Sequence, residues 1–362
     1  MSDASAPSRT PHAFINLATI RANYRALAAF CPSAETSAVV KADCYGHGMT
    51  HVAPALFDEG CRTFFVAYLQ EGIDLRAVLG DEPVIYVFNG ITDEEREDFA
   101  RHSLSPICNR SEELELVTSP GFSGSYGIHF DTGMNRLGIR QEGVEHARGL
   151  TKDKPPAIVM SHLACADQPD NSVNRRQLES FSQIAALFPE AQASLSATAG
   201  IYLGGEYHFD LVRPGIGLYG GGPARPSGLK LKTAMTLTAP ILNLFSIEAG
   251  ETVGYGGSHT ARSPSTIATV ALGYADGFLR SGGNFGFGVI EGMPCPIVGR
   301  ISMDLITLDV TDIAENVTVG DEVEFIGRFA GYEIQAEALG TLGYELTSRL
   351  GGRISRSWGE QE

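Results

Sequence analysis

The sequence predicts an α/β fold in two parts, a parallel (β/α)8 barrel of the TIM type followed by a mainly antiparallel β domain. Two observations predict it. Up to about residue 220, short apolar or β-branched runs alternate with longer amphipathic or alanine-rich stretches, as in repeated β/α units. After about residue 232, short Thr/Val/Ile-rich runs are separated by Gly and Pro, as in antiparallel sheets. A length of 362 residues accommodates both parts.

The barrel is predicted from strand candidates that alternate with helices. Eight such strands over roughly 200 residues fit a closed barrel better than an open doubly wound sheet. Helical character is clearest at Gly72–Leu79 and Asn174–Phe188, and a helix is also expected after Asn16. The strand candidates are 37–42, 63–68, 83–88, 104–108, 125–130, 157–162, 193–197 and 215–219.

The second part follows a Gly- and Pro-rich linker at about 222–232. We therefore expect a flexible leader at 1–12, a barrel at 13–231 and a β domain at 232–362. The strands expected in the β domain are Met235–Phe245, Thr266–Leu272, Phe287–Ile290, Ile306–Val310 and Glu322–Ile326.

Composition narrows the class of partner. Lys and Arg number 27 against 43 Asp and Glu, and the net charge of −16 repels phosphate backbones and anionic membranes. No apolar run approaches the length of a membrane span, and the first residues carry no apolar signal segment. Six scattered cysteines without a CxxC pair predict reduced thiols and no metal site. We expect a cytoplasmic protein that binds neither nucleic acid nor membrane.

The first predicted strand ends in a lysine. Ser37–Val40 leads directly into Lys41, and the carboxyl ends of barrel strands line the mouth where active sites lie. Burial lowers the pKa of a lysine and frees its amine for imine chemistry. The alternative is a lysine whose ammonium group reaches solvent from the strand end.

The residues around this lysine resemble a known motif. Val39–Gly48 (VVKADCYGHG) resembles the pyridoxal-phosphate lysine motif of alanine racemases, with Cys44 where alanine is usual. Matching motifs continue in order from about Phe14 to about Arg356. The resemblance implies a pyridoxal 5'-phosphate barrel followed by a β domain, in a homodimer with shared active sites.

Cofactor-binding residues follow from the same resemblance. Lys41 would hold the cofactor as an internal Schiff base, and Tyr45 would contact its phosphate. Thr198 matches the hydroxyl position of the family's phosphate loop, in which Ala197 replaces the usual asparagine. Taken alone, these segments are ordinary turns and core residues. The remaining residues implied at the cofactor are Gly215, Ile216, Tyr219 and Arg213.

The resemblance implies a role for Arg213 in the reaction mechanism. A guanidinium facing the pyridine nitrogen would keep that nitrogen unprotonated and would weaken the ring as an electron sink. Proton exchange would still proceed, while transamination would be limited. The alternative is an arginine paired with a surface carboxylate such as Asp210.

Racemisation needs acid–base groups on both faces of the α-carbon. The resemblance implies Lys41 for one face and Tyr255 of the partner subunit for the other. His162 corresponds to the family histidine that links this tyrosine to Arg213. A histidine at a strand end is otherwise a common structural residue.

Substrate-binding residues are also implied by the resemblance. Arg136 aligns with the arginine that orients the substrate carboxylate. Met303 would offer its backbone amide from the partner, Asp304 would help to close the pocket, and Tyr274 would narrow the entrance. The alternatives are a solvated arginine and β-domain turns.

Two further positions depart from the family pattern. His129 stands where many members carry a carbamylated lysine that steers the arginine at position 136, so carbamylation is not expected and the imidazole is a candidate for that task. Gly352 stands where some members have a tyrosine.

The resemblance implies interconversion of L-alanine and D-alanine, for peptidoglycan or for alanine catabolism. A racemase of broader specificity that also accepts serine is an alternative. Two further alternatives are a pyridoxal-phosphate decarboxylase, which Arg213 disfavours, and a non-enzymatic pyridoxal-phosphate-binding barrel, which Tyr255 and the β domain disfavour.

Overall fold

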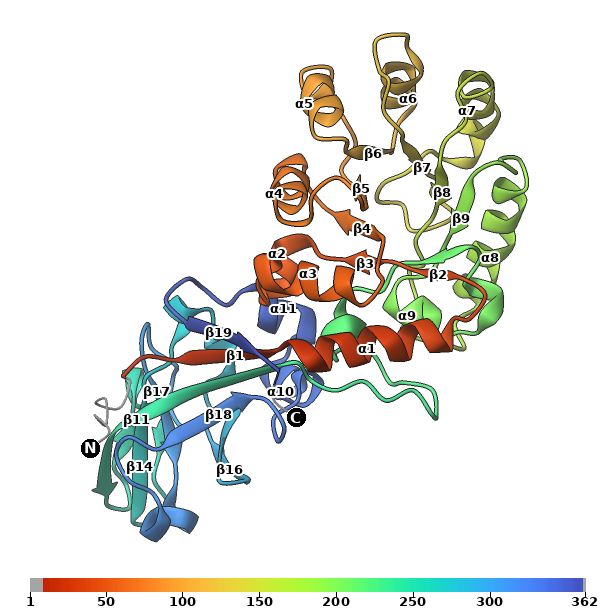
Figure 1. Ribbon diagram of the computed structural model, residues 1–362. Coiled ribbons are helices and arrows are strands. Elements are labelled where there is room, and N and C mark those ends of the chain that lie inside the picture. The colour runs from red at the N-terminus through yellow and green to blue at the C-terminus, as the bar shows by residue number, and fades with distance from the viewer. Residues whose placement is uncertain (1–8, 361–362) are drawn as a thin grey trace. The chain divides into compact units, whose positions relative to one another are not determined.

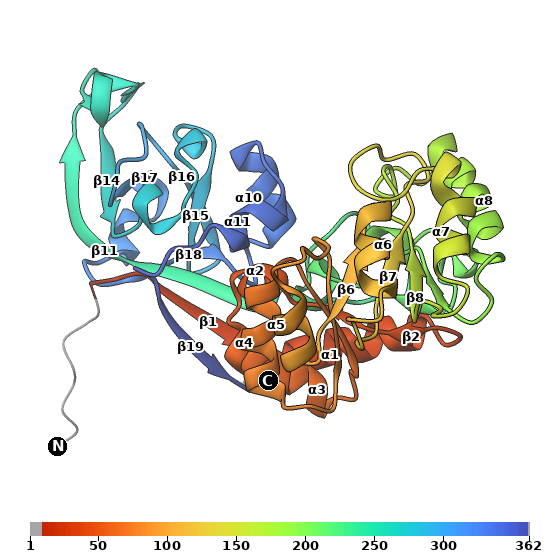
Figure 2. The ribbon, with the colours of Figure 1, turned by 90° about the horizontal axis from the view of Figure 1, so that it is seen from above.

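The computed structural model describes residues 9–360 and divides into two compact units (Figures 1 and 2). One unit comprises residues 20–231, and the other joins residues up to 19 with those from 232 onwards. Most of the predicted leader, residues 1–8, lies outside the described residues.

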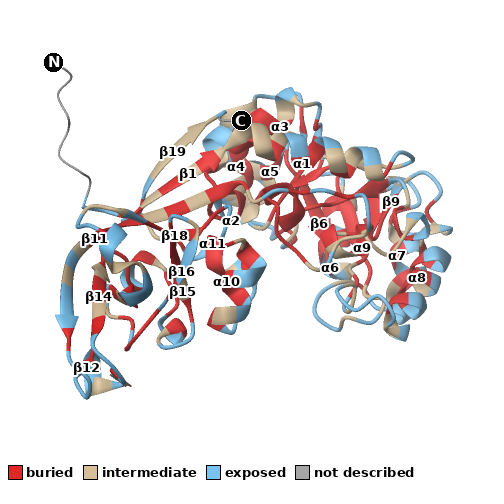
Figure 3. Ribbon diagram, turned by 90° about the horizontal axis from the view of Figure 1, so that it is seen from below, coloured by how far each residue is buried: buried red, intermediate tan, exposed pale blue. Residues whose placement is uncertain are grey.

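The unit of residues 20–231 is built on a parallel sheet whose strands follow one another in chain order. Each strand is short and almost wholly buried, as expected where helices cover a parallel sheet (Figure 3). The strands are β3 (Ala38–Val39), β4 (Thr63–Val66), β5 (Val84–Val87), β6 (Ser105–Cys108), β7 (Gly127–His129), β8 (Ile158–Met160) and β9 (Gln192–Ser194).

Two further strands close this sheet on itself. β2 (Glu35–Thr36), which leads into β3, pairs in parallel with β10 (Leu211–Val212). The chain around β10 is bonded in turn to the β9 segment, since Asp210 N donates to Ala193 O at 3.0 Å and Arg213 N donates to Ser196 O at 2.8 Å. The predicted parallel barrel is therefore confirmed.

Helices lie between successive strands on the outside of the curled sheet (Figure 1). In α8 (Ser172–Ala185), Leu178, Phe181 and Ile184 face inward at helical spacing, and the Asn171 side chain caps the helix by accepting Val173 N. The others are α1 (Leu17–Phe30), α2 (Lys41–Gly46), α3 (Met49–Asp58), α4 (Leu69–Leu79), α5 (Arg96–Arg101), α6 (Ser111–Thr118), α7 (Val144–Leu150) and α9 (Thr198–Ile201).

The eighth strand lies earlier than predicted. Residues 215–219 were expected to form it, but Ile216–Tyr219 is the 3-10 helix η3, and the strand is β10. The backbone amides of Gly215 and Gly217 donate to the Thr198 hydroxyl at 3.0 and 3.2 Å, so they are not available to a strand ladder. The prediction of a strand at 215–219 was wrong because the pattern within this segment cannot show that its amides bond to Thr198, a residue distant in the sequence.

The other unit is a mainly antiparallel sheet, which confirms the predicted class of the second part. Its central strand, β11 (Met235–Ile247), pairs in antiparallel fashion with β1 (His12–Asn16), β14 (Ser265–Val270) and β18 (Glu322–Ile326). Only the pairing of β1 with β19 (Ser355–Gly359) is parallel among its described strands. The rest are β12 (Thr252–Val253), β13 (His259–Thr260), β15 (Phe287–Ile290), β16 (Met293–Pro296) and β17 (Ile306–Asp309), with helices α10 (Tyr332–Leu339) and α11 (Gly343–Ser348).

Residues 13–19, expected in the barrel, lie in this second unit. In β1 the side chains of Ala13 and Ile15 are buried while their neighbours are partly exposed, which is the alternation of a strand with one covered face. The hydrogen-bonding partner of β1 is more than 200 residues away, at Met235–Thr238. Among the described residues, no helix has the length and apolar character needed to span a membrane.

Candidate active site

Five groups that can carry positive charge lie after the carboxyl ends of barrel strands or in the loops that follow. Lys41 follows β3, His129 ends β7, Arg136 lies in the next loop, His162 follows β8, and Arg213 follows β10. Burial and the charge of Arg136 lower the pKa of Lys41. Burial and the charges of Arg213 and Arg136 lower the pKa of His129 to about 4. A buried arginine, a largely buried lysine and an exposed arginine whose charge acts on that lysine favour an anionic ligand.

His162 belongs to the same group. Its pKa is lowered to about 3 by burial and by the positive charges around it, chiefly those of Arg213 and Arg136. It is therefore a neutral imidazole at physiological pH. Both His162 and Arg213 are described residues, and no hydrogen bond joins them, so the link between them stays a prediction.

Arg213 is held by uncharged groups. The residue is 1% exposed, and its guanidinium donates from Nη1 to Ser194 Oγ and from Nη2 to Ser161 O and Leu195 O, at 2.7 and 3.3 Å for the two carbonyls. Its Nε–H donates to no atom of residues 9–360. Asp210 accepts Ala193 N instead of pairing with this arginine, so the surface-pair alternative is wrong. Burial lowers the pKa of Arg213 to about 9, which leaves it charged at neutral pH.

The residues predicted at the cofactor phosphate lie together. Thr198 begins α9, and its hydroxyl accepts the amides of Gly215 and Gly217. A Cβ added to Gly215 would lie 2.4 Å from the Tyr45 hydroxyl oxygen, so the Tyr45 side chain packs directly on this glycine. The ring centroids of Tyr45 and Tyr219 are 5.3 Å apart.

One backbone amide in this cluster lacks a partner. Ile216 is 1% exposed, and its N–H has no acceptor among the described residues. A buried N–H without a partner is rare and indicates a water or ligand acceptor. Together with the Tyr45 and Thr198 hydroxyls, it provides donors that suit a phosphate group.

The turn that follows Lys41 has an unusual backbone. Four consecutive residues without glycine, Ala42 to Tyr45, have φ between 51° and 55°, in the left-handed helical region. Each such residue costs about 1–2 kcal/mol relative to the right-handed form. The lysine Nζ lies 6.0 Å from the centre of the Phe88 ring.

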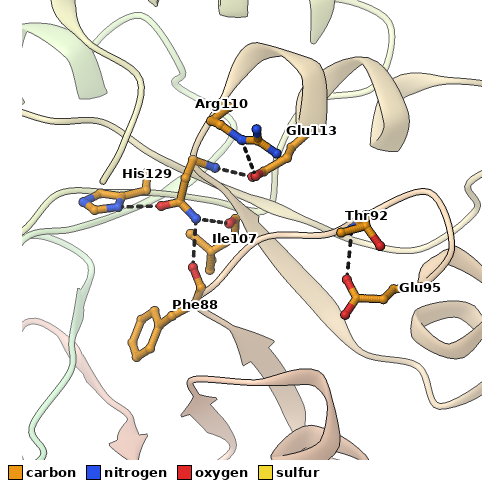
Figure 4. A network of polar contacts seen from close by, with 8 residues as sticks. Phe88, Thr92, Glu95, Ile107, Arg110, Glu113 and His129 are labelled. Atoms are coloured by element: carbon orange, nitrogen blue, oxygen red, sulfur yellow. Dashed lines mark hydrogen bonds and ion pairs between the residues drawn. The ribbon is translucent and has the colours of Figure 1, made fainter. Parts of the chain in front are cut away.

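His129, labelled in Figure 4, is oriented by Asn109, which the sequence analysis did not single out. The Asn109 amide nitrogen donates to Phe88 O at 2.9 Å and Ile107 O at 3.0 Å, so its oxygen faces His129 Nδ1 at 2.9 Å. Nδ1 must therefore carry the hydrogen, and in the neutral ring Nε2 carries a lone pair. The available signal was a polar residue directly after β6.

Arg136 lies on a closed turn after β7. Asp131 Oδ1 accepts the amides of Gly133, Met134 and Asn135, and Ile139 N returns to His129 O at 2.8 Å. The arginine side chain is exposed at the tip of this turn. It is therefore available to a ligand that enters from solvent.

The β unit gathers its predicted residues around the loop 299–304. Tyr274 N donates to Ser302 O at 3.1 Å, and Ala275 N donates to Met303 O at 2.9 Å. Asp304 forms an ion pair with Arg353 at 2.7 Å, and Arg353 also contacts Asp276 at 3.2 Å.

Tyr255 begins the 3-10 helix η4 (Tyr255–Gly257), beside the same loop. A Cβ added to Gly254 would lie 3.3 Å from Arg300 N, which places the start of this turn against residue 300. Tyr255 is 73% exposed and Met303 is 53% exposed. A Cβ added to Gly352 would meet nothing within 4 Å, so this departure leaves open space.

Comparison with known proteins identifies the family. The family model "Alanine racemase, N-terminal domain" matches residues 15–223, and "Alanine racemase, C-terminal domain" matches residues 234–358. An alanine racemase of Rhodospirillum rubrum is 40% identical over 338 residues, which cover 91% of this chain and 90% of that protein. A catabolic alanine racemase of Agrobacterium fabrum is 40% identical over 355 residues, which cover 96% and 92%.

A solved structure agrees with these matches. The crystal structure of alanine racemase from Bartonella henselae with covalently bound pyridoxal phosphate has a TM-score of 0.92 and 37% sequence identity. The match covers 97% of this chain and 100% of that chain. Since both domain models, relatives at 40% identity and this structure agree, the chain belongs to the alanine racemase family of isomerases.

Proposed function

We propose that this enzyme interconverts L-alanine and D-alanine with pyridoxal 5'-phosphate as cofactor. The observation that carries the proposal is that Lys41, whose pKa is lowered, lies near Arg213 and Arg136 at the barrel mouth, together with the donors of Tyr45, Thr198 and Ile216. When bound, the cofactor supplies an electron-accepting ring that makes the Cα–H of an attached amino acid acidic.

The residues assigned to the cofactor fit it. Lys41 would hold it covalently, because a lysine with a lowered pKa has an available amine. Tyr45, Thr198 and Ile216 would bind the phosphate. Gly215 admits the Tyr45 hydroxyl, and Tyr219 packs against the Tyr45 ring.

Arg213 favours racemisation over other chemistry at the same cofactor. We assign its Nε–H to the pyridine nitrogen, where a cation keeps the ring a weak electron sink. Ser161, Ser194 and Leu195 fix the guanidinium without neutralising it. A decarboxylase would require an acid at this position, and Asp210 is engaged by Ala193 N.

Two groups would move the α-proton. Lys41 serves one face, and Tyr255 of the partner subunit serves the other. The 73% exposure of Tyr255 in the single chain supports a shared site, because a phenol in open solvent offers no controlled proton transfer. His162, held neutral, would connect this tyrosine with Arg213.

Substrate binding would rest on Arg136 and the loop 299–304. Arg136 would take the alanine carboxylate as a bidentate partner. The Met303 amide would complete this contact, while Tyr274 and Asp304 limit the entrance. Because sterics discriminate one methylene by only about 1–3 kcal/mol, serine is the substrate alternative.

Incubation with L-alanine in deuterated water tests the activity. Racemisation predicts loss of optical rotation together with α-deuteration; release of carbon dioxide or inert binding would reject it. Borohydride reduction of the cofactor-loaded chain should label Lys41 and not Lys154, a matched lysine whose pKa burial also lowers. The same assay with L-serine measures substrate range.

Mixing two inactive variants tests the shared site. In a hybrid dimer, one protomer carries Lys41→Ala and the other carries Tyr255→Phe. Each site takes residue 41 from one protomer and residue 255 from the other, so one site holds both substitutions and the other holds neither. Random mixing should restore about a quarter of the wild-type activity in a two-fold symmetric dimer. No recovery would show that both residues act within one chain.

The physiological role has two candidates, D-alanine supply for peptidoglycan and alanine catabolism. Deletion of the gene in its host distinguishes them: a requirement for added D-alanine indicates supply, and loss of growth on one enantiomer indicates catabolism. We place the reaction in the cytoplasm, which the six unpaired thiols support.

A further inference from the structure

The left-handed turn after Lys41 needs external support. A left-handed conformation is disfavoured for L-residues, and here it extends over Ala42, Asp43, Cys44 and Tyr45 without a glycine. Such segments persist only where surrounding contacts hold them, and they gather at functional sites. The contacts that hold this turn therefore bear on the position of the lysine.

Three side chains bond to the backbone of the turn or its flank. Asp43 Oδ1 accepts Met49 N at 2.6 Å, and His47 Nδ1 donates to Cys44 O at 2.9 Å and Tyr45 O at 3.0 Å. Both residues lie within or beside the turn. The third is Glu71, whose Oε1 accepts Ala42 N at 2.7 Å across a separation of 29 residues.

Glu71 joins two neighbouring β/α units. Its other oxygen, Oε2, accepts Ala67 N at 2.8 Å and Tyr68 N at 3.2 Å, at the end of β4 and the start of α4. β4 is the parallel neighbour of β3, the strand that precedes Lys41. One carboxylate therefore ties the residue after the lysine to the adjacent strand end.

Two other glutamates show that capping alone does not require this second contact. Glu95 accepts Thr92 N at 2.9 Å just before α5. Glu113 accepts Asn109 N at 2.7 Å and Arg110 Nε at 3.0 Å at α6. The bonds of these two glutamates go to residues within four positions in the sequence. Glu71 also accepts the N–H of Ala42, which lies in the preceding β/α repeat.

We propose that Glu71 is a positioning residue for Lys41, which holds the Ala42 amide and so the left-handed turn that directs the lysine side chain. This rests on the proposed function of Lys41 as the cofactor anchor. Glu71 is also the carboxylate whose charge acts on Lys41, in opposition to Arg136.

The test compares Glu71→Gln with Glu95→Gln in the full chain. A glutamine has only one accepting oxygen, so it can accept either from Ala42 N or from Ala67 N and Tyr68 N, but not from both sets. Its NH2 group would face the N–H group that is left over. Glu95→Gln changes a comparable backbone contact far from the lysine turn in sequence. Two readouts are used: amide hydrogen exchange of residues 42–45 without cofactor, and borohydride capture of pyridoxal phosphate on Lys41 as its concentration is varied.

We expect Glu71→Gln to accelerate exchange at 42–45 and to raise the concentration for half-capture about tenfold, since a charge-assisted hydrogen bond is lost. Glu95→Gln should change neither readout. Wild-type exchange at 42–45 in Glu71→Gln, or wild-type capture by it, would overturn the proposal.

A second substitution separates positioning from general destabilisation. Glycine adopts the left-handed conformation without penalty, so Ala42→Gly added to Glu71→Gln should restore part of the capture. A role confined to capping α4 would gain nothing from a glycine at 42, and absence of rescue would overturn the proposal. If the wild-type chain captures no cofactor on Lys41, the proposed function and the positioning role both fail, while the exchange data still decide whether Glu71 holds the turn.

Discussion

His129 should make the barrel unit less stable in mild acid. The folded state keeps this imidazole neutral down to a pKa of about 4, whereas its ordinary value is 6.5. Between these values the unfolded chain binds a proton that the folded chain does not, so stability falls as the pH falls through 6.5 towards 4. Linkage then gives a loss of about 2 kcal/mol at pH 5 and about 3 kcal/mol at pH 4, relative to neutral pH.

The matched variant is His129→Asn, which does not titrate but keeps a side-chain N–H for the Asn109 oxygen. The difference between wild type and variant cancels the titration of groups that His129 does not influence; His162 is the exception, because the charge of His129 contributes to its lowered pKa. Trp358 lies in β19 of the other unit, so the stability of the barrel is measured from within it. The measurement is amide hydrogen exchange of peptides from β6 to β8. A difference that changes by less than about 0.5 kcal/mol between pH 7.5 and pH 5 would refute the reasoning.

Three further outcomes are expected. Thr198→Val leaves the buried amides of Gly215 and Gly217 unpaired and should lower the free energy of unfolding of the barrel by about 2–4 kcal/mol, measured in urea. Thr198→Ser keeps the hydroxyl and should lower it by about 1 kcal/mol; equal stabilities of the two variants would contradict the role of the hydroxyl. Arg213→Glu should raise transamination, seen as pyruvate formed per turnover, and an unchanged ratio of pyruvate to racemised alanine would remove the arginine from control of the ring. Tyr255→Phe should slow α-proton washout from one enantiomer more than from the other; unchanged washout from both would exclude Tyr255 from proton transfer.

The barrel could be predicted because its signal is local. Each buried parallel strand is a short apolar run, and β4 and β6 are buried at every position. The run at 215–219 is equally apolar, but its backbone bonds to Thr198, a contact that no local pattern reveals. The same reason explains β1, whose antiparallel partner begins at Met235.

The family motif predicted candidate residues for the barrel mouth, but not what orients them. Asn109 and Glu71 each act on a residue 20 or more positions away, His129 and Ala42 respectively. The left-handed turn was equally hidden, because Ala42 and Cys44 give no sign of a positive φ. Long-range hydrogen bonds of this kind become visible only when the strands are placed side by side.

The charges at the barrel mouth divide in a way that suits the two proposed partners, the cofactor ring nitrogen and the substrate carboxylate. His129 and His162 are neutral, and the pKa of Lys41 is lowered, so Arg213 and Arg136 are the permanent cations of the group. Arg213 is buried and fixed by carbonyl and hydroxyl oxygens, as a contact to a resident ring requires. Arg136 is exposed on a turn, as a contact to a carboxylate that enters and leaves requires. Neutral histidines near these arginines add hydrogen-bonding capacity without further repulsion, and Asn109 fixes the Nδ1 hydrogen of His129.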